Sequence, residues 1–311
     1  MAKILITESV HPIGPELLTA AGHTVVYADR DMDIIRREIV DADAVLVRII
    51  ELPGSLLATA KNLKIVSKHG VGYDNIDLDY CKSHGVAVTI TPNANSLSVA
   101  EHAFTLMLTL AKNIIPVSNE YREIGFAAKN HAPGIEMTGK TLGLIGMGRI
   151  GKHILHMCRD GLDMHVIVYD PYISEVPEGV EKVDDLSELL RRADVVTLHC
   201  LLTDETRKLI DRERLALMKP TALLINCARG PIVDEAALIE ALESGRLAGA
   251  GLDVTDPEPV APDSPLFKLS NVIVTPHYAP TTVESATRVS KIAAENINAV
   301  LAGKEPVGRI V

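Results

Sequence analysis

The chain lacks tryptophan, long apolar runs and any sign of a targeting segment. None of its 311 residues is Trp, so tryptophan fluorescence cannot report ligand binding. No apolar run approaches the ~20 residues that a membrane-spanning helix needs. Residues 1–7 follow the pattern of a strand, and no long apolar segment of the kind found in a signal peptide follows them. We therefore expect no membrane partner.

Cysteine and positive charge are also scarce. Cys81, Cys158, Cys200 and Cys227 are far apart and form no C-x-x-C pair, which is typical of buried thiols in a reducing compartment. We therefore expect a cytoplasmic protein. The 31 basic residues are outnumbered by 41 acidic ones, which gives a formal net charge of −10, and no basic cluster is present. This balance argues against a nucleic-acid partner.

A glycine-rich turn between a short strand and a helix is the most informative stretch. Thr141–Ile145 predict a buried strand, and Gly146, Gly148 and Gly151 follow with the G-x-G-x-x-G spacing. In such a unit the first glycine allows a tight turn, the second lets backbone approach a diphosphate, and the third lets the helix pack on the strand. The diphosphate would lie at the helix N-terminus, where unpaired N–H groups and the helix dipole favour an anion. The pattern predicts a dinucleotide site.

A second strand, His165–Tyr169, is followed by an acidic residue at the spacing expected of a ribose-binding carboxylate. Asp170 lies 19 residues after Gly151. A 2′-phosphate would require an arginine next to this acid, but Pro171 and Tyr172 follow instead. We therefore expect NAD rather than NADP. The alternative is an ordinary turn between a strand and a helix that binds nothing.

Strands alternate with helices along most of the chain. Strands are predicted at 4–7, 25–27, 45–48, 64–67 and 86–89, and again at 141–145, 165–169, 195–199, 222–226, 248–254 and 272–275. This alternation predicts an α/β protein with parallel, doubly wound sheets. Long helices are predicted at 97–112 and 282–301, and residues 116–138 read as an irregular connector with some helix. We expect two domains, residues 1–97 with 284–311, and residues 98–283.

Polar side chains follow three strands of the second array. Arg229 follows one strand, Asp253 and Glu258 follow the next, and His277 follows the last. Because the carboxyl ends of parallel strands share one edge, these groups should lie beside the glycine-rich turn. A guanidinium, a carboxylate and an imidazole beside a nicotinamide indicate hydride transfer. The alternative is a loop histidine and a surface ion pair.

The loop at 68–77 is a second candidate site, at the carboxyl end of a strand in the first array. Its glycines would free backbone N–H groups that can hold a carboxylate. The alternative is a plain glycine turn. His69 in this loop could contact a substrate or cap the turn. Elsewhere, His153, His156 and Cys158 lie on one predicted helix but complete no ligand set, so we expect no metal.

In the order and spacing of these motifs, the sequence resembles the D-isomer-specific 2-hydroxyacid dehydrogenases over essentially its whole length. The motifs are GMGRIG at 146–151, Asp170, CARG at 227–230, Asp253 with Glu258, and His277 after Thr275 and Pro276. Residues 75–77 and 91–101 look most like those of phosphoglycerate dehydrogenases. The resemblance implies a Rossmann NAD-binding domain inserted into a flavodoxin-like substrate domain.

The resemblance implies three catalytic residues. Arg229 would bind the substrate carboxylate and 2-oxo oxygen, for which a planar, permanently charged fork is suited. His277 would protonate the developing alkoxide during reduction and remove the proton during oxidation. Glu258 would hydrogen-bond the imidazole, fix its orientation and favour its protonated form.

The resemblance also implies binding residues. Those for NAD are Gly146, Gly148, Arg149, Ile150, Gly151, Asp170, Cys200, Cys227, Ala228 and Asp253. Those for the substrate are Arg48, Lys68, Val71, Gly72, Arg229 and His277. Among the latter, the backbone amides of Val71 and Gly72 would hold the carboxylate, and Arg48 and Lys68 a phosphate.

The implied function is NAD-dependent interconversion of a small D-2-hydroxy acid and its 2-oxo acid. 3-Phosphoglycerate, and with it serine synthesis, is the first expectation. Hydroxypyruvate, glyoxylate and sulfolactate stay open, because Lys68 stands where a second arginine is typical and Thr255 and residues 278–281 depart from the family pattern near the substrate. An NAD-sensing binding protein is the alternative of another class. The resemblance further implies a homodimer built on the cofactor domains, and we expect no serine feedback because no regulatory domain is recognised.

Overall fold

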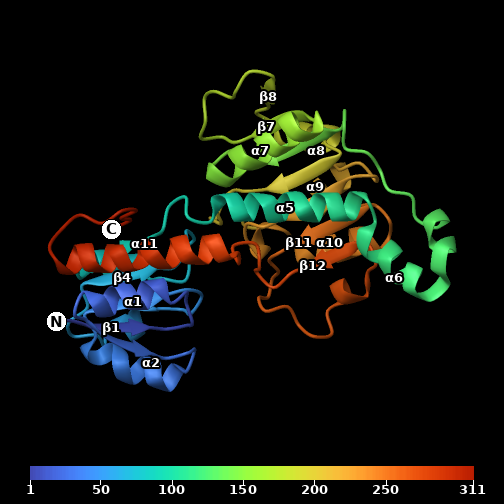
Figure 1. The fold of residues 1–311 in the computed structure, drawn as a ribbon. Coiled ribbons are helices and arrows are strands. Elements are labelled where there is room, and N and C mark those ends of the chain that lie inside the picture. The colour runs from blue at the N-terminus through green and yellow to red at the C-terminus, as the bar shows by residue number, and fades with distance from the viewer. The chain divides into compact units, whose positions relative to one another are not determined.

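The chain forms two parallel sheets, each flanked by helices on both faces (Figure 1). The computed structural model describes all residues, 1–311, and they divide into two units. Unit 1 comprises Met1–Asn95 and Pro280–Val311, and unit 2 comprises Ser96–Ala279. The second unit is therefore inserted into the sequence of the first. The predicted fold class, two doubly wound parallel sheets in an α/β protein, is confirmed.

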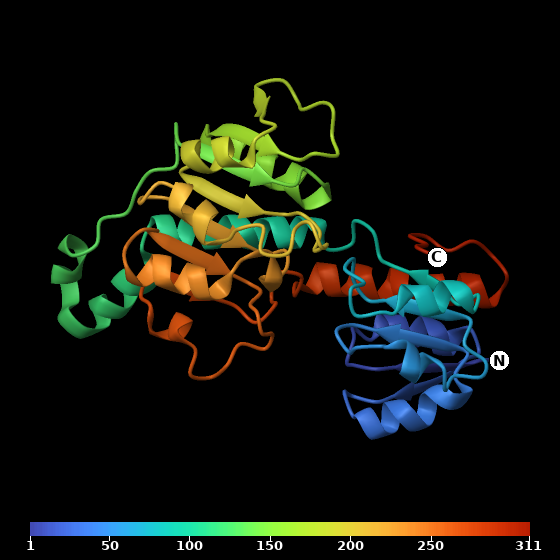
Figure 2. The same ribbon diagram turned by 180° about the vertical axis from the view of Figure 1, so that it is seen from behind.

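Unit 1 contains a five-stranded sheet in the order β2-β1-β3-β4-β5, the flavodoxin-like order. Its strands are β1 (Lys3–Ile6), β2 (Thr24–Tyr27), β3 (Ala44–Val47), β4 (Ile65–Lys68) and β5 (Ala87–Thr89). Its helices are α1 (Ile13–Ala20), α2 (Met32–Glu38), α3 (Gly54–Leu57), α4 (Leu78–Ser83) and α11 (Val283–Leu301), with a 3-10 turn at Ile39–Asp41. Figure 2 shows the helices of this unit on both faces of its sheet.

The two faces of this sheet follow from alternation along its strands. Ile4 and Ile6 of β1 pack in a cluster with residues of α1 and α11, whereas Leu5 packs in a cluster with residues of α2, α3 and α4. Successive side chains of a strand point to opposite faces, so apolar residues at every position require cover on both sides. The helix predicted at 282–301 supplies part of that cover, since α11 packs against α1 and β4 (Figure 1).

Unit 2 contains a seven-stranded sheet in the order β12-β11-β10-β9-β6-β7-β8. Its strands are β6 (Thr141–Ile145), β7 (His165–Tyr169), β8 (Val180–Lys182), β9 (Val195–Leu198), β10 (Leu223–Asn226), β11 (Gly249–Leu252) and β12 (Val272–Val274). Its helices are α5 (Ser96–Ala111), α6 (Ile114–Ile124), α7 (Arg149–Leu162), α8 (Leu186–Arg192), α9 (Arg212–Leu217) and α10 (Glu235–Glu243), with 3-10 turns at Gly125–Asn130, Gly230–Ile232 and Pro265–Lys268. Six of the strands repeat the Rossmann order, with β12 added at one edge.

Side-chain caps explain where several helices begin. Asp185, Asp211 and Asp234 precede α8, α9 and α10, and each carboxylate accepts a backbone N–H of the first helical turn. Thr282 caps α11 in the same way. These caps satisfy N–H groups of the first turn that have no partner within the helix.

Two segments of unit 2 differ from a simple sequence pattern. The short edge strand β8 was not predicted, because its three residues carry no apolar run and its pairing with β7 alone defines it. The stretch 116–138, predicted as an irregular connector with some helix, includes most of α6, which has no buried residue. In Figure 1, α6 and the turn after it project from the sheet of unit 2.

Candidate active site

The glycine-rich turn connects β6 to α7 and leaves free space beside Gly148 at the N-terminus of α7. Gly146 has a φ of +89°, and a Cβ there would lie 2.8 Å from the backbone N of Cys200. A Cβ on Gly151 would lie 2.3 Å from the carbonyl oxygen of Gly146, whereas nothing lies within 4 Å of a Cβ on Gly148. The first and third glycines are therefore required by close packing of the chain, and the second faces open space.

This turn fits a bound dinucleotide. Gly148 is the N-cap residue of α7, and no side chain caps the helix. Arg149 and Ile150 form its first turn. The N–H groups at this end are thus open to a diphosphate, and the helix dipole favours the negative charge.

Asp170 lies directly beside the glycine-rich turn. One carboxylate oxygen accepts the backbone N–H of Met147 at 2.9 Å, and the other accepts that of Tyr172 at 3.0 Å. These two bonds fix the plane of the carboxylate. Each oxygen keeps a second lone pair for a ribose hydroxyl.

The turn that carries Arg229 is shaped by a buried amide. Asn226, the last residue of β10, is 1% exposed, and its carboxamide accepts from the N–H of Ala228 at 3.0 Å and donates to the carbonyl of Arg229 at 2.9 Å. A Cβ on Gly230 would lie only 1.9 Å from the carbonyl oxygen of Thr255. The close approach at Gly230 and the buried amide together set where the Arg229 side chain begins. Asn226 was not predicted as a site residue.

His277 and Glu258 form a hydrogen-bonded pair in the loops after β12 and β11. Nδ1 of His277 lies 2.6 Å from Oε1 of Glu258, and both side chains are about one-third exposed, at 33% and 39%. His277 has a φ of 53°, which is rare for a residue other than glycine. Its backbone N–H donates to the carbonyl of Asp253 at 2.8 Å.

Asp253 is the buried centre of this loop structure. Its carboxylate, 1% exposed, accepts the hydroxyl of Thr275 at 2.5 Å and the backbone N–H groups of Tyr278 and Ala279 at 2.7 and 2.9 Å. Burial alone would raise the pKa of Asp253, but the hydrogen bonds from His102, Thr275 and the two N–H groups outweigh it and hold this pKa below its ordinary value. The residues on both sides of His277 are therefore anchored to one carboxylate.

His102 of α5 also reaches this carboxylate and was not predicted as a site residue. Its Nε2 lies 3.0 Å from the Thr275 hydroxyl and 3.4 Å from Oδ1 of Asp253. Its ring contacts that of Tyr278 edge-on, with 6.1 Å between centroids. The helical spacing of α5 indicates packing on the sheet, and only the tertiary structure shows that this one polar residue meets the loop after β12.

The predicted cysteine positions hold neutral thiols. Burial raises the pKa of Cys200 to about 11 and that of Cys227 well above its ordinary value, with the negative charge of Asp253 adding to the latter. A thiol that keeps its proton is a poor nucleophile. Cys200 and Cys227 can therefore line a binding site but cannot act as nucleophiles. Ala228 carries no reactive group and can only line the site. All four cysteines are free, and no group of three or more His, Cys, Asp or Glu residues could hold a metal.

In unit 1, the predicted substrate loop follows β4. The backbone N–H groups of Val71 and Gly72 donate no hydrogen bond within the chain, and both residues are half-buried. Two adjacent free N–H groups can bind one carboxylate. The ammonium of Lys68 donates to the side-chain oxygen of Asn75 at 2.5 Å and to the carbonyl of Arg48. The guanidinium of Arg48 donates to the carbonyl of Ser9 at 3.0 Å.

Two histidines at strand ends, His69 after β4 and His199 after β9, each have a ring nitrogen that is buried without a partner. These are Nε2 of His69 and Nδ1 of His199, although each residue is partly exposed elsewhere. Burial lowers the pKa of each to about 3, and the positive charges of Arg48 and Lys68 contribute for His69. Both rings are therefore neutral near pH 7 and cannot donate a proton as an imidazolium.

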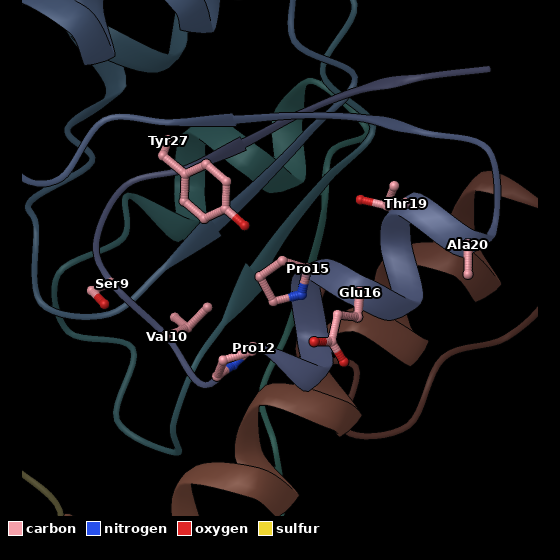
Figure 3. A pocket seen from close by; sticks show the side chains of 8 residues that line it. All are labelled: Ser9, Val10, Pro12, Pro15, Glu16, Thr19, Ala20 and Tyr27. Atoms are coloured by element: carbon pink, nitrogen blue, oxygen red, sulfur yellow. The ribbon is translucent and has the colours of Figure 1, made fainter.

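A hollow of about 590 Å³ lies on unit 1 between α1 and the segment after β1 (Figure 3). Ser9, Val10, Pro12, Pro15, Glu16, Thr19, Ala20 and Tyr27 line it. Its only charged side chain is the Glu16 carboxylate, so it is unsuited to an anionic acid. It holds none of the predicted site residues.

Comparison with known proteins identifies the family. The sequence profile of the D-isomer specific 2-hydroxyacid dehydrogenase, NAD binding domain, matches residues 104–279, which is more than half of the chain. The chain therefore belongs to this family, and its central unit is an NAD-binding domain. The predicted resemblance and the predicted NAD-binding domain are confirmed. No helix of the structure is both long and apolar enough to span a membrane.

Three proteins that are similar to this chain carry the names of three different dehydrogenases or reductases. D-3-phosphoglycerate dehydrogenase of Methanocaldococcus jannaschii is 42% identical over 308 residues, which cover 98% of this chain and 58% of that protein. Glyoxylate reductase of Thermofilum pendens is 37% identical over 319 residues, which cover 98% of this chain and 93% of that protein. The structure of D-lactate dehydrogenase from Aquifex aeolicus with NAD and lactic acid has a TM-score of 0.88 at 33% identity, covering 96% of both chains. The chain thus spans little more than half the length of the first relative.

Proposed function

We propose that this chain catalyses reversible hydride transfer between NAD and a small D-2-hydroxy acid. The single observation that carries the proposal is the Glu258–His277 pair, with 2.6 Å between Oε1 and Nδ1. A carboxylate on one ring nitrogen fixes the tautomer and leaves the other nitrogen to exchange a proton with a substrate. Family membership and the glycine-rich turn support a nicotinamide as the partner of that proton transfer.

In this reaction the side chains handle the anion and the proton. Arg229 binds the carboxylate and the 2-oxo oxygen with its two-pronged guanidinium. His277 gives its proton to the oxygen as C2 is reduced and takes it back in the reverse direction, and Glu258 balances the charge of the imidazolium. When bound, the nicotinamide supplies or accepts the hydride. In unit 1, the adjacent N–H groups of Val71 and Gly72 are a second pair of donors suited to a carboxylate.

The preference for NAD over NADP is supported by Asp170. Its carboxylate is held by the N–H groups of Met147 and Tyr172, so it cannot easily turn away. A ribose diol donates hydrogen bonds to this group, whereas a 2′-phosphate would be repelled by it. We therefore propose NAD as the working cofactor.

For the substrate, we propose 3-phosphoglycerate and 3-phosphohydroxypyruvate, with Arg48 and Lys68 as the positive groups for the phosphate. This would place the chain in serine synthesis, and the phosphoglycerate dehydrogenase relatives support that choice. Hydroxypyruvate, glyoxylate and sulfolactate are the competing substrates, and the glyoxylate reductase relative supports the second.

A substrate panel tests the proposal. The rate of NADH oxidation would be measured with 3-phosphohydroxypyruvate, hydroxypyruvate, glyoxylate, pyruvate, 2-oxoglutarate and sulfopyruvate, and repeated with NADPH. We expect kcat/KM to be highest for the phosphorylated acid. A higher value for another acid would reject the proposed substrate and keep the reaction. His277→Ala should abolish turnover while NADH still binds, and a wild-type protein that binds NADH but reduces none of these acids would support the sensing protein instead.

We also propose a homodimer formed through the projecting segment of unit 2. This segment, α6 with the turn after it, exposes Ile114, Tyr121, Ile124 and Phe126, with exposed fractions of 54%, 59%, 46% and 72%. A concentration of large apolar side chains on one exposed helix is typical of a covered interface. Sedimentation velocity should give a dimer for the wild type and a monomer for Phe126→Asp. A wild-type monomer at micromolar concentration would reject this part of the proposal.

We propose the cytoplasm as the site of action. Four free cysteines, three of them buried, are compatible with a reducing compartment. Fractionation of cells that express the tagged full-length protein would test this.

A further inference from the structure

We propose that Glu8, which lies in none of the sequence motifs, is a positioning residue that fixes the turn carrying Arg48. The inference extends the proposed function, because it concerns how the proposed phosphate-binding arginine is held. Glu8 follows β1, and Arg48 follows the neighbouring strand β3, so both lie at the carboxyl edge of the sheet in unit 1.

The carboxylate of Glu8 is a buried anion surrounded by backbone donors. Glu8 is 1% exposed. It accepts the backbone N–H of Arg48 at 2.7 Å, that of Ile49 at 3.0 Å and that of Ile50 at 3.5 Å. The Thr7 hydroxyl donates to it at 3.0 Å. Three successive N–H groups that converge on one anion form a nest, and here the nest is filled by the protein's own carboxylate.

The carbonyl groups of the same turn accept hydrogen bonds from two other side chains. The ammonium of Lys68 donates to the carbonyl of Arg48, and the carboxamide of Asn75 donates to the carbonyl of Ile50 at 2.7 Å. The N–H groups at 48–50 therefore point to a buried negative charge, while the carbonyls point to a buried positive charge and an amide. Hydrogen bonds to charged groups are stronger than neutral ones, and burial leaves water unable to replace them.

The residue next to Glu8 holds the other end of Arg48. The guanidinium donates from one terminal nitrogen to the carbonyl of Ser9 at 3.0 Å. The dipeptide Glu8-Ser9 thus fixes both the backbone and the charged end of Arg48. The Glu8 carboxylate forms one long ion pair, with Arg30, whose Nε lies 3.8 Å from Oε1 and whose side chain is 59% exposed. Glu8 is therefore built to order the turn rather than to form an ion pair.

Glu8→Gln tests the inference, because it keeps the shape of the side chain and replaces one acceptor oxygen with a donor. Asp43→Asn is the matched control. Asp43 precedes β3 at the opposite edge of the same sheet, and its carboxylate accepts the backbone N–H of Lys3 at 2.9 Å. Both changes turn a carboxylate that accepts backbone N–H groups into an amide. Only the first should affect the Arg48 turn.

The first measurement is amide hydrogen exchange in the full-length protein. We expect the N–H groups at 48–50 to exchange about tenfold faster or more in Glu8→Gln than in the wild type, and to be unchanged in Asp43→Asn. This readout does not depend on the substrate. Unchanged exchange at 48–50 in Glu8→Gln would overturn the inference.

The second measurement separates positioning from general stability. In Glu8→Gln we expect KM for 3-phosphohydroxypyruvate to rise about tenfold, with kcat and the KM for glyoxylate changed less than about twofold. In an Arg48→Ala background, Glu8→Gln should add less than about twofold to that KM, since two residues that act through one group are not additive. Equal losses with both acids, or full additivity, would overturn the inference. If Arg48→Ala alone left the KM unchanged, the proposed phosphate contact would fail, and hydrogen exchange would still decide whether Glu8 orders the turn.

Discussion

Oε1 of Glu258 lies 2.6 Å from Nδ1 of His277, and the contact joins the loops that follow two adjacent strands, β11 and β12. The histidine has a positive φ of 53°, and Thr275, two residues before it, and Tyr278, directly after it, both donate to the carboxylate of Asp253. The position of the imidazole is therefore fixed twice. Glu258 hydrogen-bonds the ring, and the buried carboxylate of Asp253 hydrogen-bonds the chain before and after the histidine. The predictions below test these relationships.

Glu258→Gln should slow reduction more than it weakens cofactor binding. The amide still accepts the hydrogen bond from Nδ1, but it no longer stabilises the imidazolium that donates the proton. We expect kcat for reduction at pH 7 to fall by about 10- to 100-fold. Glu243→Gln, a change at the exposed end of α10, is the control and should leave kcat unaltered. Calorimetry should show NADH affinity within about threefold of the wild type. An unchanged kcat in Glu258→Gln would reject the role of this carboxylate.

Gly230→Ala should misplace Arg229. The added Cβ would lie 1.9 Å from the Thr255 carbonyl oxygen, and that atom belongs to backbone that cannot simply rotate away. A displacement near 1 Å can cost about 100-fold in rate, so we expect kcat/KM to fall by at least about that factor. Gly161→Ala in α7 is the matched control, because nothing lies within 4 Å of its Cβ. Circular dichroism would verify that both variants fold, and full activity of Gly230→Ala would contradict the proposed placement.

Asp170→Asn should relax the cofactor preference. The amide can keep one of the bonds to the backbone N–H groups, but it no longer repels a 2′-phosphate. We expect the ratio of kcat/KM for NADH to that for NADPH to fall by about tenfold or more, which is about 1.4 kcal/mol of discrimination. Asp184→Asn removes an exposed carboxylate from the same unit and should leave the ratio unchanged. The same ratio in both variants would show that Asp170 does not read the ribose.

His199→Gln should make the stability of unit 2 less sensitive to acid. The pKa of His199 is about 3 in the folded chain, against an ordinary value of 6.5. Below pH 6.5 the unfolded chain binds a proton that the folded chain does not, so this group destabilises the fold as pH falls toward 3. The slope attributable to it approaches about 1.4 kcal/mol per pH unit. Urea unfolding at pH 7, 6 and 5 should show a shallower slope for His199→Gln than for the wild type and for exposed His165→Gln. Equal slopes would contradict the prediction.

The main elements of the fold could be predicted because their signals are local. Thr141–Ile145 and His165–Tyr169 are short apolar runs bounded by polar residues or glycine, and both form strands with those bounds. The helix predicted at 282–301 forms as α11, Val283–Leu301, with Thr282 as its cap. Strand β8 was missed because Val180–Lys182 is defined by pairing with β7 and not by its own composition.

Site residues divide in the same way. Gly146, Gly148 and Gly151 could be found from spacing, because the turn that they form is a local structure. Glu8 and His102 could not. A glutamate after a strand and a histidine within a helix have no local signature, since their function depends on which distant backbone groups or side chains they meet. Glu8 meets the turn at 48–50, about 40 residues away in the sequence.

The sequence by itself determined the family, the dinucleotide turn and the order in which Arg229, Glu258 and His277 follow their strands. Those features depend on residue type and spacing along the chain, which parallel strands convert into a shared edge. Only the tertiary structure decided how these groups are held. It placed the Asp253 carboxylate within hydrogen-bonding distance of the chain before and after His277. It also placed Glu8 at the N–H groups, and Lys68 at a carbonyl, of the Arg48 turn. The physical reason is burial, because a charge removed from water must find its partners wherever the fold places them.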